Sequence, residues 1–285
     1  MIVYVRQLYK QSLINKIFSM LKIEEVNGKT IINLPINSKS NVRRIKRIIE
    51  KLCKYLYKNN IKNVVLEQEL FKNEEVKNIL YSNNENILEG AKLAKLLVYK
   101  VIKKVFNLKN KNIQAGEVTI LANQNDEITV EHIMQIAKNV KRLNIITSNT
   151  KKFENLEDYL FKELGILIKI TNNLKFNLKS SDVIVNMDFP EETLNKLAMP
   201  NNATIINVQK GIDIYSKKFA GINIKSWEIN IPREIKQEGF IDSHLYEAKL
   251  FTMTTMKAFE QMEKDNISIK KLIGKNGTIN KKEFK

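Results

Sequence analysis

Apolar and polar residues follow two rhythms along this chain: short apolar runs, and longer segments in which apolar residues recur with helical spacing. In the second half these rhythms alternate. The pattern predicts strands at 118–122, 145–147, 166–170, 183–185 and 204–208, and helices at 128–143, 151–164 and 191–198. Apolar strands separated by amphipathic helices are typical of a parallel sheet that is covered on both faces.

This alternation predicts the fold class and the domain organisation. The class is α/β, with a Rossmann-like parallel sheet domain preceded by a smaller α/β domain. We expect a basic α/β N-terminal domain at 1–110, the Rossmann-like domain at 111–263, and a loosely ordered Lys-rich tail at 264–285. The second domain is expected to end in a single helix from Ser243 to about Met262. In the first half, Asn27-Gly28 predicts a tight hairpin turn, and helices are expected at 41–58 and 91–106.

The loop after the strand 118–122 lacks the glycines of a dinucleotide-binding fold. Asn123-Gln124-Asn125-Asp126-Glu127 stands where the G-x-G-x-x-G fingerprint is expected. Glycines let the backbone approach a pyrophosphate, and the positive end of the next helix must be free to receive it. Carboxylates at this helix end satisfy its dipole and repel a phosphate. We therefore expect weak or no NADPH binding, and expect Asp126→Gly with Glu127→Gly to improve it.

Polar residues follow the predicted strands at the edge where open α/β sheets bind ligands. The predicted cleft positions, which would contact a cofactor, are Asn123, Ser148, Asn149, Thr150, Lys151 and Asp188. Asp188 has a second interpretation, as the cap of a helix that starts near Glu191. Asn207 and Gln209 are expected to line the same crevice. Lys210-Gly211 is either an anion contact or a plain turn.

The second half resembles a known family in two short runs. The runs Asn144 to Lys152 and Ser181-Asp182-Val183-Ile184-Val185-Asn186 resemble motifs in the NADP-binding domain of shikimate dehydrogenases and glutamyl-tRNA reductases. The resemblance implies an adenine and 2′-phosphate site at the family's Asn-Arg-Thr. Here Asn149-Thr150 has no Arg between Asn and Thr, and Lys151 or Lys152 would supply a point charge instead of a planar fork. We identify no counterpart of the family's catalytic Lys and Asp, or of the reductases' nucleophilic Cys.

Charge is distributed unevenly between the two halves. The net charge is +17, and residues 1–112 contain 23 basic and 9 acidic residues, a balance of +14. Basic residues concentrate in the predicted helices 41–58 and 91–106, together with Tyr55, Tyr57 and Tyr99. Two interpretations stay open. The charge is either compositional drift on solvated faces, since only 6 of 48 basic residues are Arg, or a nucleic-acid surface. We find no helix-turn-helix, zinc-finger or RNA-binding motif.

Few residues suit nucleophilic or metal chemistry. Cys53 lies on the apolar side of a predicted helix, which favours a buried structural thiol over a nucleophile. His132 is either a general base near the cleft or, by default, a histidine on a helix surface, and the same holds for His244. We expect no metal site, because Cys and His residues at zinc-ligand spacing are absent from the sequence.

Apolar run length and cysteine content indicate a compartment. We see no run of about 18 apolar residues and no basic leader followed by an apolar core, so neither a membrane helix nor a signal peptide is expected. A single cysteine cannot form an internal disulfide. We therefore expect a cytoplasmic protein without a membrane partner.

Three functions remain open at this level. We prefer a degenerate Rossmann-like binding or regulatory protein, of unknown small-molecule or protein ligand and without ordinary dinucleotide binding. NADP is a possible but disfavoured cofactor. The first alternative is an NADP-dependent oxidoreductase of the shikimate dehydrogenase and glutamyl-tRNA reductase type. The second is a nucleic-acid-binding protein that uses the basic N-terminal half.

Overall fold

The chain divides into two compact units, each with its own parallel sheet. The computed structural model describes residues 1–8, 20–37, 39–176, 178–209, 212 and 219–284. The first unit combines residues 1–90 with 231–252, and the second combines residues 91–230 with 253–285.

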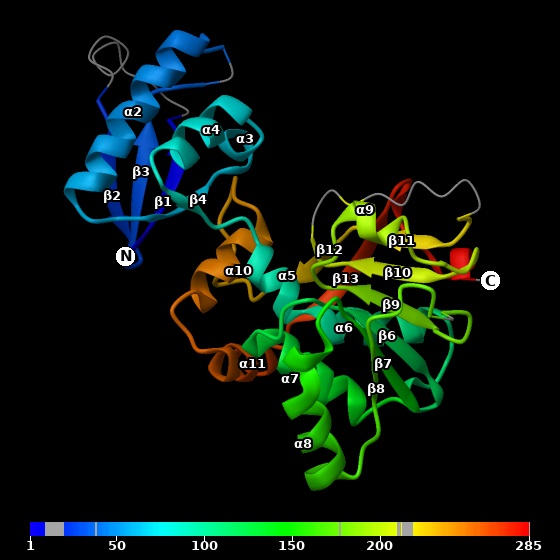
Figure 1. Cartoon of the computed structure of the whole chain (residues 1–285). Coiled ribbons are helices and arrows are strands. Elements are labelled where there is room, and N and C mark those ends of the chain that lie inside the picture. The colour runs from blue at the N-terminus through cyan, green and yellow to red at the C-terminus, as the bar shows by residue number, and fades with distance from the viewer. Residues whose placement is uncertain (9–19, 38, 177, 210–211, 213–218, 285) are drawn as a thin grey trace. The chain divides into compact units, whose positions relative to one another are not determined.

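The second unit contains a six-stranded sheet in which all neighbouring strands are parallel (Figure 1). Its strands are β6 (Glu117–Leu121), β7 (Arg142–Ile146), β8 (Lys169–Thr171), β9 (Val183–Asn186), β10 (Thr204–Asn207) and β11 (Ile222–Ile224). They lie in the order β11-β10-β9-β6-β7-β8. With β6 counted as the first strand, this is the doubly wound order 3-2-1-4-5-6 read from the other edge. The predicted α/β, Rossmann-like fold class is confirmed.

Helices connect or flank these strands, and some differ in length from the predictions. The helices are α5 (Ala91–Leu96), α6 (Val98–Leu108), α7 (Glu127–Ala137), α8 (Glu154–Leu164), α9 (Glu191–Leu194) and α11 (Thr255–Lys264), with 3-10 turns η1 (Ile113–Ala115), η2 (Thr150–Phe153) and η3 (Lys281–Phe284). The predicted helix 128–143 ends at Ala137, because β7 already begins at Arg142. The predicted helix 91–106 is divided at Leu97.

The prediction of a loosely ordered tail at 264–285 is wrong. Residues Ser268–Gly274 form β13, which pairs antiparallel with β12 (Ser226–Asn230) and with the short β14 (Gly277–Thr278). The apolar side chains Ile267, Ile269, Leu272 and Ile279 are buried. A segment that buries its apolar residues and pairs its backbone is ordered whatever its lysine content.

The first unit is built on a five-stranded sheet. Its strands are β1 (Ile2–Gln7), β2 (Lys22–Val26), β3 (Lys29–Leu34), β4 (Asn63–Leu66) and β5 (Asn86–Ile87), in the order β2-β3-β1-β4-β5. The strand β2 is antiparallel to β3, and the other pairs are parallel. The predicted turn is present, since Asn27 and Gly28 have φ of 50° and 72°. Positive φ at both central residues is what a tight hairpin requires.

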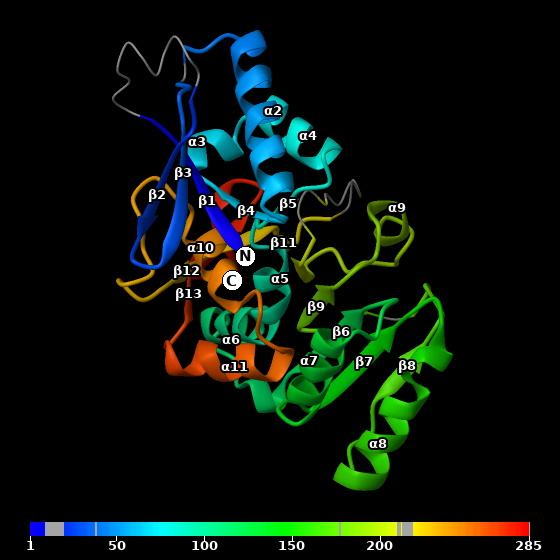
Figure 2. The ribbon, with the colours of Figure 1, turned by 90° about the vertical axis from the view of Figure 1, so that its left-hand side faces the viewer.

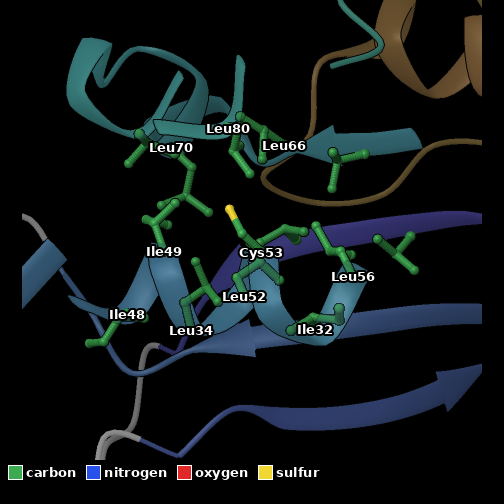
Figure 3. Close-up of a cluster of buried hydrophobic side chains, with 14 of the residues drawn as sticks. Ile32, Leu34, Ile48, Ile49, Leu52, Cys53, Leu56, Leu66, Leu70 and Leu80 are labelled. Carbon is green, nitrogen blue, oxygen red and sulfur yellow. The ribbon is translucent and has the colours of Figure 1, made fainter. Parts of the chain in front are cut away.

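One face of this sheet is covered by α2 (Val42–Lys58), α3 (Gln68–Phe71) and α4 (Glu74–Ser82). The helices α2 and α4 lie side by side (Figure 2). The helix α2 starts where predicted, because the Asn41 side chain accepts the backbone N–H of Arg44. Its apolar residues join Val3, Val5 and Leu66 in one core that includes Cys53 (Figure 3). Burial, with a smaller contribution from Glu85, raises the pKa of the Cys53 thiol to about 11, which fits the predicted structural thiol.

The returning segment 231–252 belongs to this first unit. Phe240 lies edge-on to Tyr4, with ring centroids 6.1 Å apart, and the Gly239 carbonyl accepts the N–H of Gln68 at 2.8 Å. Gly239 has φ of 83°, and an added Cβ would lie 2.8 Å from a carboxylate oxygen of the buried Glu67. The division therefore differs from the predicted 1–110 and 111–263, because the second unit begins at Ala91 and the chain later returns to the first.

The predicted helix from Ser243 to Met262 is two helices, one in each unit. These are α10 (Asp242–Leu250) and α11, and α10 starts after Ile241 without a side-chain cap, so Ser243 lies inside it. Within the described ranges, we find no helix with the length and apolar composition that crossing a membrane requires.

Candidate functional site

The candidate site lies where the strand order of the second unit reverses. The first strand of this sheet, β6, lies between β7 and β9, so the connections that leave β6 and β9 run to opposite sides of the sheet. In open α/β sheets the crevice at the carboxyl ends of these strands is the usual ligand site. The segments that line it here are the loop 123–126 after β6, residues 147–152 after β7, and residues 187–190 after β9.

The carboxylate of Asp188 binds the backbone of the loop after β6. Its two oxygens accept the backbone N–H groups of Asn123 and Gln124, each at 2.7 Å. A carboxylate on two adjacent N–H groups makes the charge-assisted contacts that a nucleotide phosphate makes in a Rossmann loop. The loop after β6 therefore already holds an anion supplied by the chain itself.

The local chain after β9 brings Asp188 to this place. The side chain of Asn186 accepts the N–H of Phe189 at 2.8 Å and donates to its carbonyl at 3.1 Å, which fixes the turn. The helix α9 follows Pro190 and has no side-chain cap. The interpretation of Asp188 as the cap of this helix is therefore wrong.

The loops after β6 and β7 are tied together by Asn123. Its Oδ1 accepts the N–H of Ser148 at 2.8 Å and the Ser148 hydroxyl at 2.7 Å. The Lys152 ammonium donates to the Asn123 carbonyl at 3.2 Å and to Gln124 Oε1 at 3.3 Å. Three predicted positions, Asn123, Ser148 and Asp188, thus share one hydrogen-bond network.

The other predicted cleft residues lie beside this network. Thr150 begins η2, and the N–H of Asn149 donates to Thr147 Oγ1 at 3.2 Å. Lys151 is exposed, and Lys152 is the lysine that contacts the loop. The N–H of Gln124 was not predicted as part of the site. Every residue except proline has a backbone N–H, so the residue type does not show which of these groups binds a ligand.

The first turn of α7 is also occupied by carboxylates. Asp126 is the N-cap and accepts the N–H of Thr129 at 2.9 Å, while its other oxygen lies 3.3 Å from Lys95 Nζ. Burial acts to raise the pKa of Asp126, but the hydrogen bonds from Thr129 and the charge of Lys95 outweigh it, so the pKa is lowered. Glu127 accepts the hydroxyl of Thr255 at 2.7 Å. The expectation that acidic residues cap this helix end is met by Asp126.

Neither histidine lies on a helix surface. His132 is 1% exposed, and its Nε2–H donates a hydrogen bond to the Lys95 carbonyl at 2.6 Å. Its ring packs edge-on against Phe259 at 5.4 Å. His244 is 2% exposed and packs against Phe71 at 4.6 Å. The default prediction of surface histidines is wrong, because each helix orients its histidine toward the interior, where the ring packs against a phenylalanine.

Three asparagine side chains form a row of hydrogen bonds across neighbouring strands beside Asp188. Asn186 donates to Asn207 at 2.9 Å, and Asn207 donates to Asn223 at 2.6 Å, across β9, β10 and β11. Asn186 and Asn207 are fully buried. The expectation that Asn207 lines an open crevice is wrong, because its amide groups are used within the sheet. Gln209 is exposed, and Lys210-Gly211 lies outside the described residues.

In this arrangement polar side chains anchor the loops to one another. The crevice presents amides, a hydroxyl and lysines, while its nearest carboxylate, Asp188, is engaged by two N–H groups. A general base needs a free acceptor within hydrogen-bond reach of a substrate proton.

Comparisons with known proteins give no family assignment. No protein-family model matches the chain, and no curated protein matches it. Similar solved structures include L-tryptophan dehydrogenase from Nostoc punctiforme, 10% identical over 91% of this chain and 77% of that chain, with a TM-score of 0.38. Aspartate transcarbamoylase from Trypanosoma cruzi is 12% identical over 75% of each chain, with a TM-score of 0.32. Ornithine carbamoyltransferase from Pyrococcus furiosus is 11% identical over 76% of this chain and 77% of that chain, with a TM-score of 0.30. Likenesses at this level carry no information about activity.

Proposed function

We propose that this protein is a Rossmann-like binding or regulatory protein that does not bind a dinucleotide in the ordinary way. The observation that carries the proposal is the carboxylate of Asp188 on the N–H groups of Asn123 and Gln124. A pyrophosphate needs these same donors, and it would meet a negative charge at van der Waals distance instead.

Two further features support the proposal. Asp126 takes the Thr129 N–H at the start of α7, so a third donor of a phosphate site is used internally. Asn123 takes the N–H and hydroxyl of Ser148, next to the place where the resembling family reads the 2′-phosphate of NADP. The second unit thus has the strand order of a dinucleotide-binding fold, but its own side chains accept the backbone N–H groups that would otherwise bind the phosphates.

The test is a fluorescence titration with NADPH of the wild type and of a triple variant, Asp188→Ala with Asp126→Gly and Glu127→Gly. Changing Asp126 and Glu127 alone leaves Asp188 on the loop. The triple change frees the N–H groups, while glycine at a helix N-cap costs only a few tenths of a kcal/mol. We expect no saturable binding by the wild type and measurable binding by the triple variant.

A control separates freed donors from lost charge. Asp158→Ala removes an exposed carboxylate on α8 and frees no backbone N–H in the loop after β6, so it is expected to leave NADPH binding unchanged. Saturable binding by the wild type would contradict the proposal and favour the NADP-dependent oxidoreductase. A triple variant that keeps the wild-type circular dichroism but binds no better would contradict the role of Asp188.

A further inference from the structure

The outer face of α2 carries a basic stripe opposite its buried residues. At 3.6 residues per turn, its members lie within about 60° of one line along the helix. They are Arg43, Lys46, Arg47, Lys54, Tyr57 and Lys58, together with the acidic Glu50, and all are exposed. The helix contains seven basic residues and one acidic residue, Glu50, a net charge of +6. Its apolar residues point to the core of the first unit, so this face is a stripe of charge on a rigid element.

The second basic segment of the chain, 91–106, uses its lysines differently. On α5 and α6, Lys95 lies 3.3 Å from Asp126, Lys100 lies 2.6 Å from Glu263, and Lys103 lies over the ring of Tyr99. On α2, by contrast, Arg43, Lys46, Lys54 and Lys58 make no ion pair with a carboxylate of the described residues. These four side chains of α2 therefore keep their charge available for a partner.

Arginine usage separates this stripe from compositional drift. The chain has 6 Arg among 48 basic residues, and three of the six are Arg43, Arg44 and Arg47. Arg44 donates to the Pro35 carbonyl at 2.9 Å, which accounts for it structurally, but Arg43 is exposed and makes no ion pair with a described carboxylate. Drift toward lysine would place lysine at exposed positions. A planar guanidinium fork suits phosphate oxygens, which accept two parallel hydrogen bonds from it.

Tyr57 indicates which phosphate-bearing partner fits. Its side chain is 85% exposed and lies on the stripe near the end of α2. A fully exposed aromatic ring beside cations is a platform on which an unpaired base stacks. An anionic membrane fits less well, because a membrane-surface helix needs an exposed apolar face and that of α2 is buried.

We propose that the outer face of α2 binds single-stranded nucleic acid. Arg43, Lys46 and Lys54 contact phosphates of one strand, and Tyr57 stacks on a base. This surface belongs to the first unit and does not depend on the proposal for the crevice of the second unit.

The test is fluorescence anisotropy of the full chain with labelled single-stranded DNA and RNA oligonucleotides over a range of salt concentrations. We expect binding that weakens steeply with salt. Arg43→Gln with Lys54→Gln should lower the slope of log affinity against log salt by about 1.4, since each phosphate contact on a single strand contributes about 0.7. The charge-matched control Lys138→Gln with Lys141→Gln, two exposed lysines of the second unit, should keep the wild-type slope.

A second pair of variants tests stacking. Tyr57→Ala should weaken binding by about 5- to 150-fold, which corresponds to about 1–3 kcal/mol per stacked base. Tyr159→Ala, at a 47% exposed tyrosine of α8, should leave it unchanged. Equal losses of salt slope in the Arg43/Lys54 and Lys138/Lys141 variants, or no oligonucleotide binding at low salt, would overturn the proposal. So would binding to phosphatidylserine vesicles without binding to oligonucleotides. Equal affinity for duplex and single strand, with no effect of Tyr57→Ala, would overturn the single-strand assignment.

Discussion

His132 shows how burial sets the chemistry of a single residue. Its ring lies between the Lys95 carbonyl, which fixes the tautomer with the proton on Nε2, and the edge of Phe259. Burial lowers the pKa of His132 to about 4, although the hydrogen bond to Lys95 and the charge of Asp126 act to raise it. The residue is therefore neutral at pH 7 and contributes packing and one hydrogen bond, which is not the role of a general base.

This lowered pKa predicts a pH dependence of stability. Between pH 6.5 and 4 the unfolded chain binds a proton on His132 that the folded chain does not bind, so acid favours unfolding. The contribution of His132 is complete above about pH 6.5 and falls as the pH decreases toward 4, by about 2 kcal/mol at pH 5. Urea unfolding at pH 8 and pH 5 measures it. We expect His132→Gln to lose less stability between these two values than the wild type, and equal losses would refute this assignment.

Among the elements, β13 contributes more to the packing of the second unit than its lysine-rich composition indicates. Its segment has three lysines within a few residues, at 270, 271 and 275, yet it pairs with β12 and buries Ile269 and Leu272. Strict alternation would place the consecutive Lys270 and Lys271 on opposite faces, but the register shifts between Glu228 and Ile229 and β13 carries one extra residue there. Both lysines are therefore exposed while Ile269 and Leu272 are buried. The structure places Lys270 and Lys271 3.7 Å from Glu228 on the partner strand.

Removal of this strand is expected to destabilise the second unit. A chain that ends at Lys264 loses β13 and β14 and leaves the edge of β12 unpaired. Each buried Ile or Leu contributes roughly 1.5–3 kcal/mol, and the loss of four such side chains approaches the total stability of an ordinary domain. We expect low solubility or a much lower melting temperature for 1–264. A chain that ends at Asn280 loses mainly exposed residues and should melt like the full chain. Similar melting of 1–264 would show that the strand contributes little.

At the scale of the whole molecule, the chain passes between its two units three times. It leaves the first unit after Gly90, returns at Ile231 and leaves again after Thr252. The returning segment is held by buried groups of the first unit: Glu247 accepts the N–H of Gly90 at 2.7 Å, and Leu245, Tyr246 and Leu250 are buried. The first unit is therefore complete only with residues from distant parts of the sequence.

This division predicts how fragments behave. A fragment 1–110, cut at the boundary that the sequence suggests, lacks the partner of Tyr4 and the segment that covers Glu67. We expect it to unfold without a cooperative transition in circular dichroism. A chain that joins 1–90 to 231–252 through a flexible linker should melt cooperatively, because it contains the whole unit. A cooperative transition in 1–110 alone would show that the returning segment is dispensable.

The sequence by itself determined the local elements and the fold class. Helical spacing defines α2, Asn27-Gly28 defines the hairpin, and the alternation of strands and helices defines the parallel sheet, because each signal lies within a few consecutive residues. Only the tertiary structure decided that Asp188 binds the loop at Asn123, 65 residues away, and that residues 231–252 return to the first unit. Contacts of this kind depend on which strand ends become neighbours in the sheet. Local periodicity does not encode that neighbourhood, and backbone N–H groups carry no residue signature.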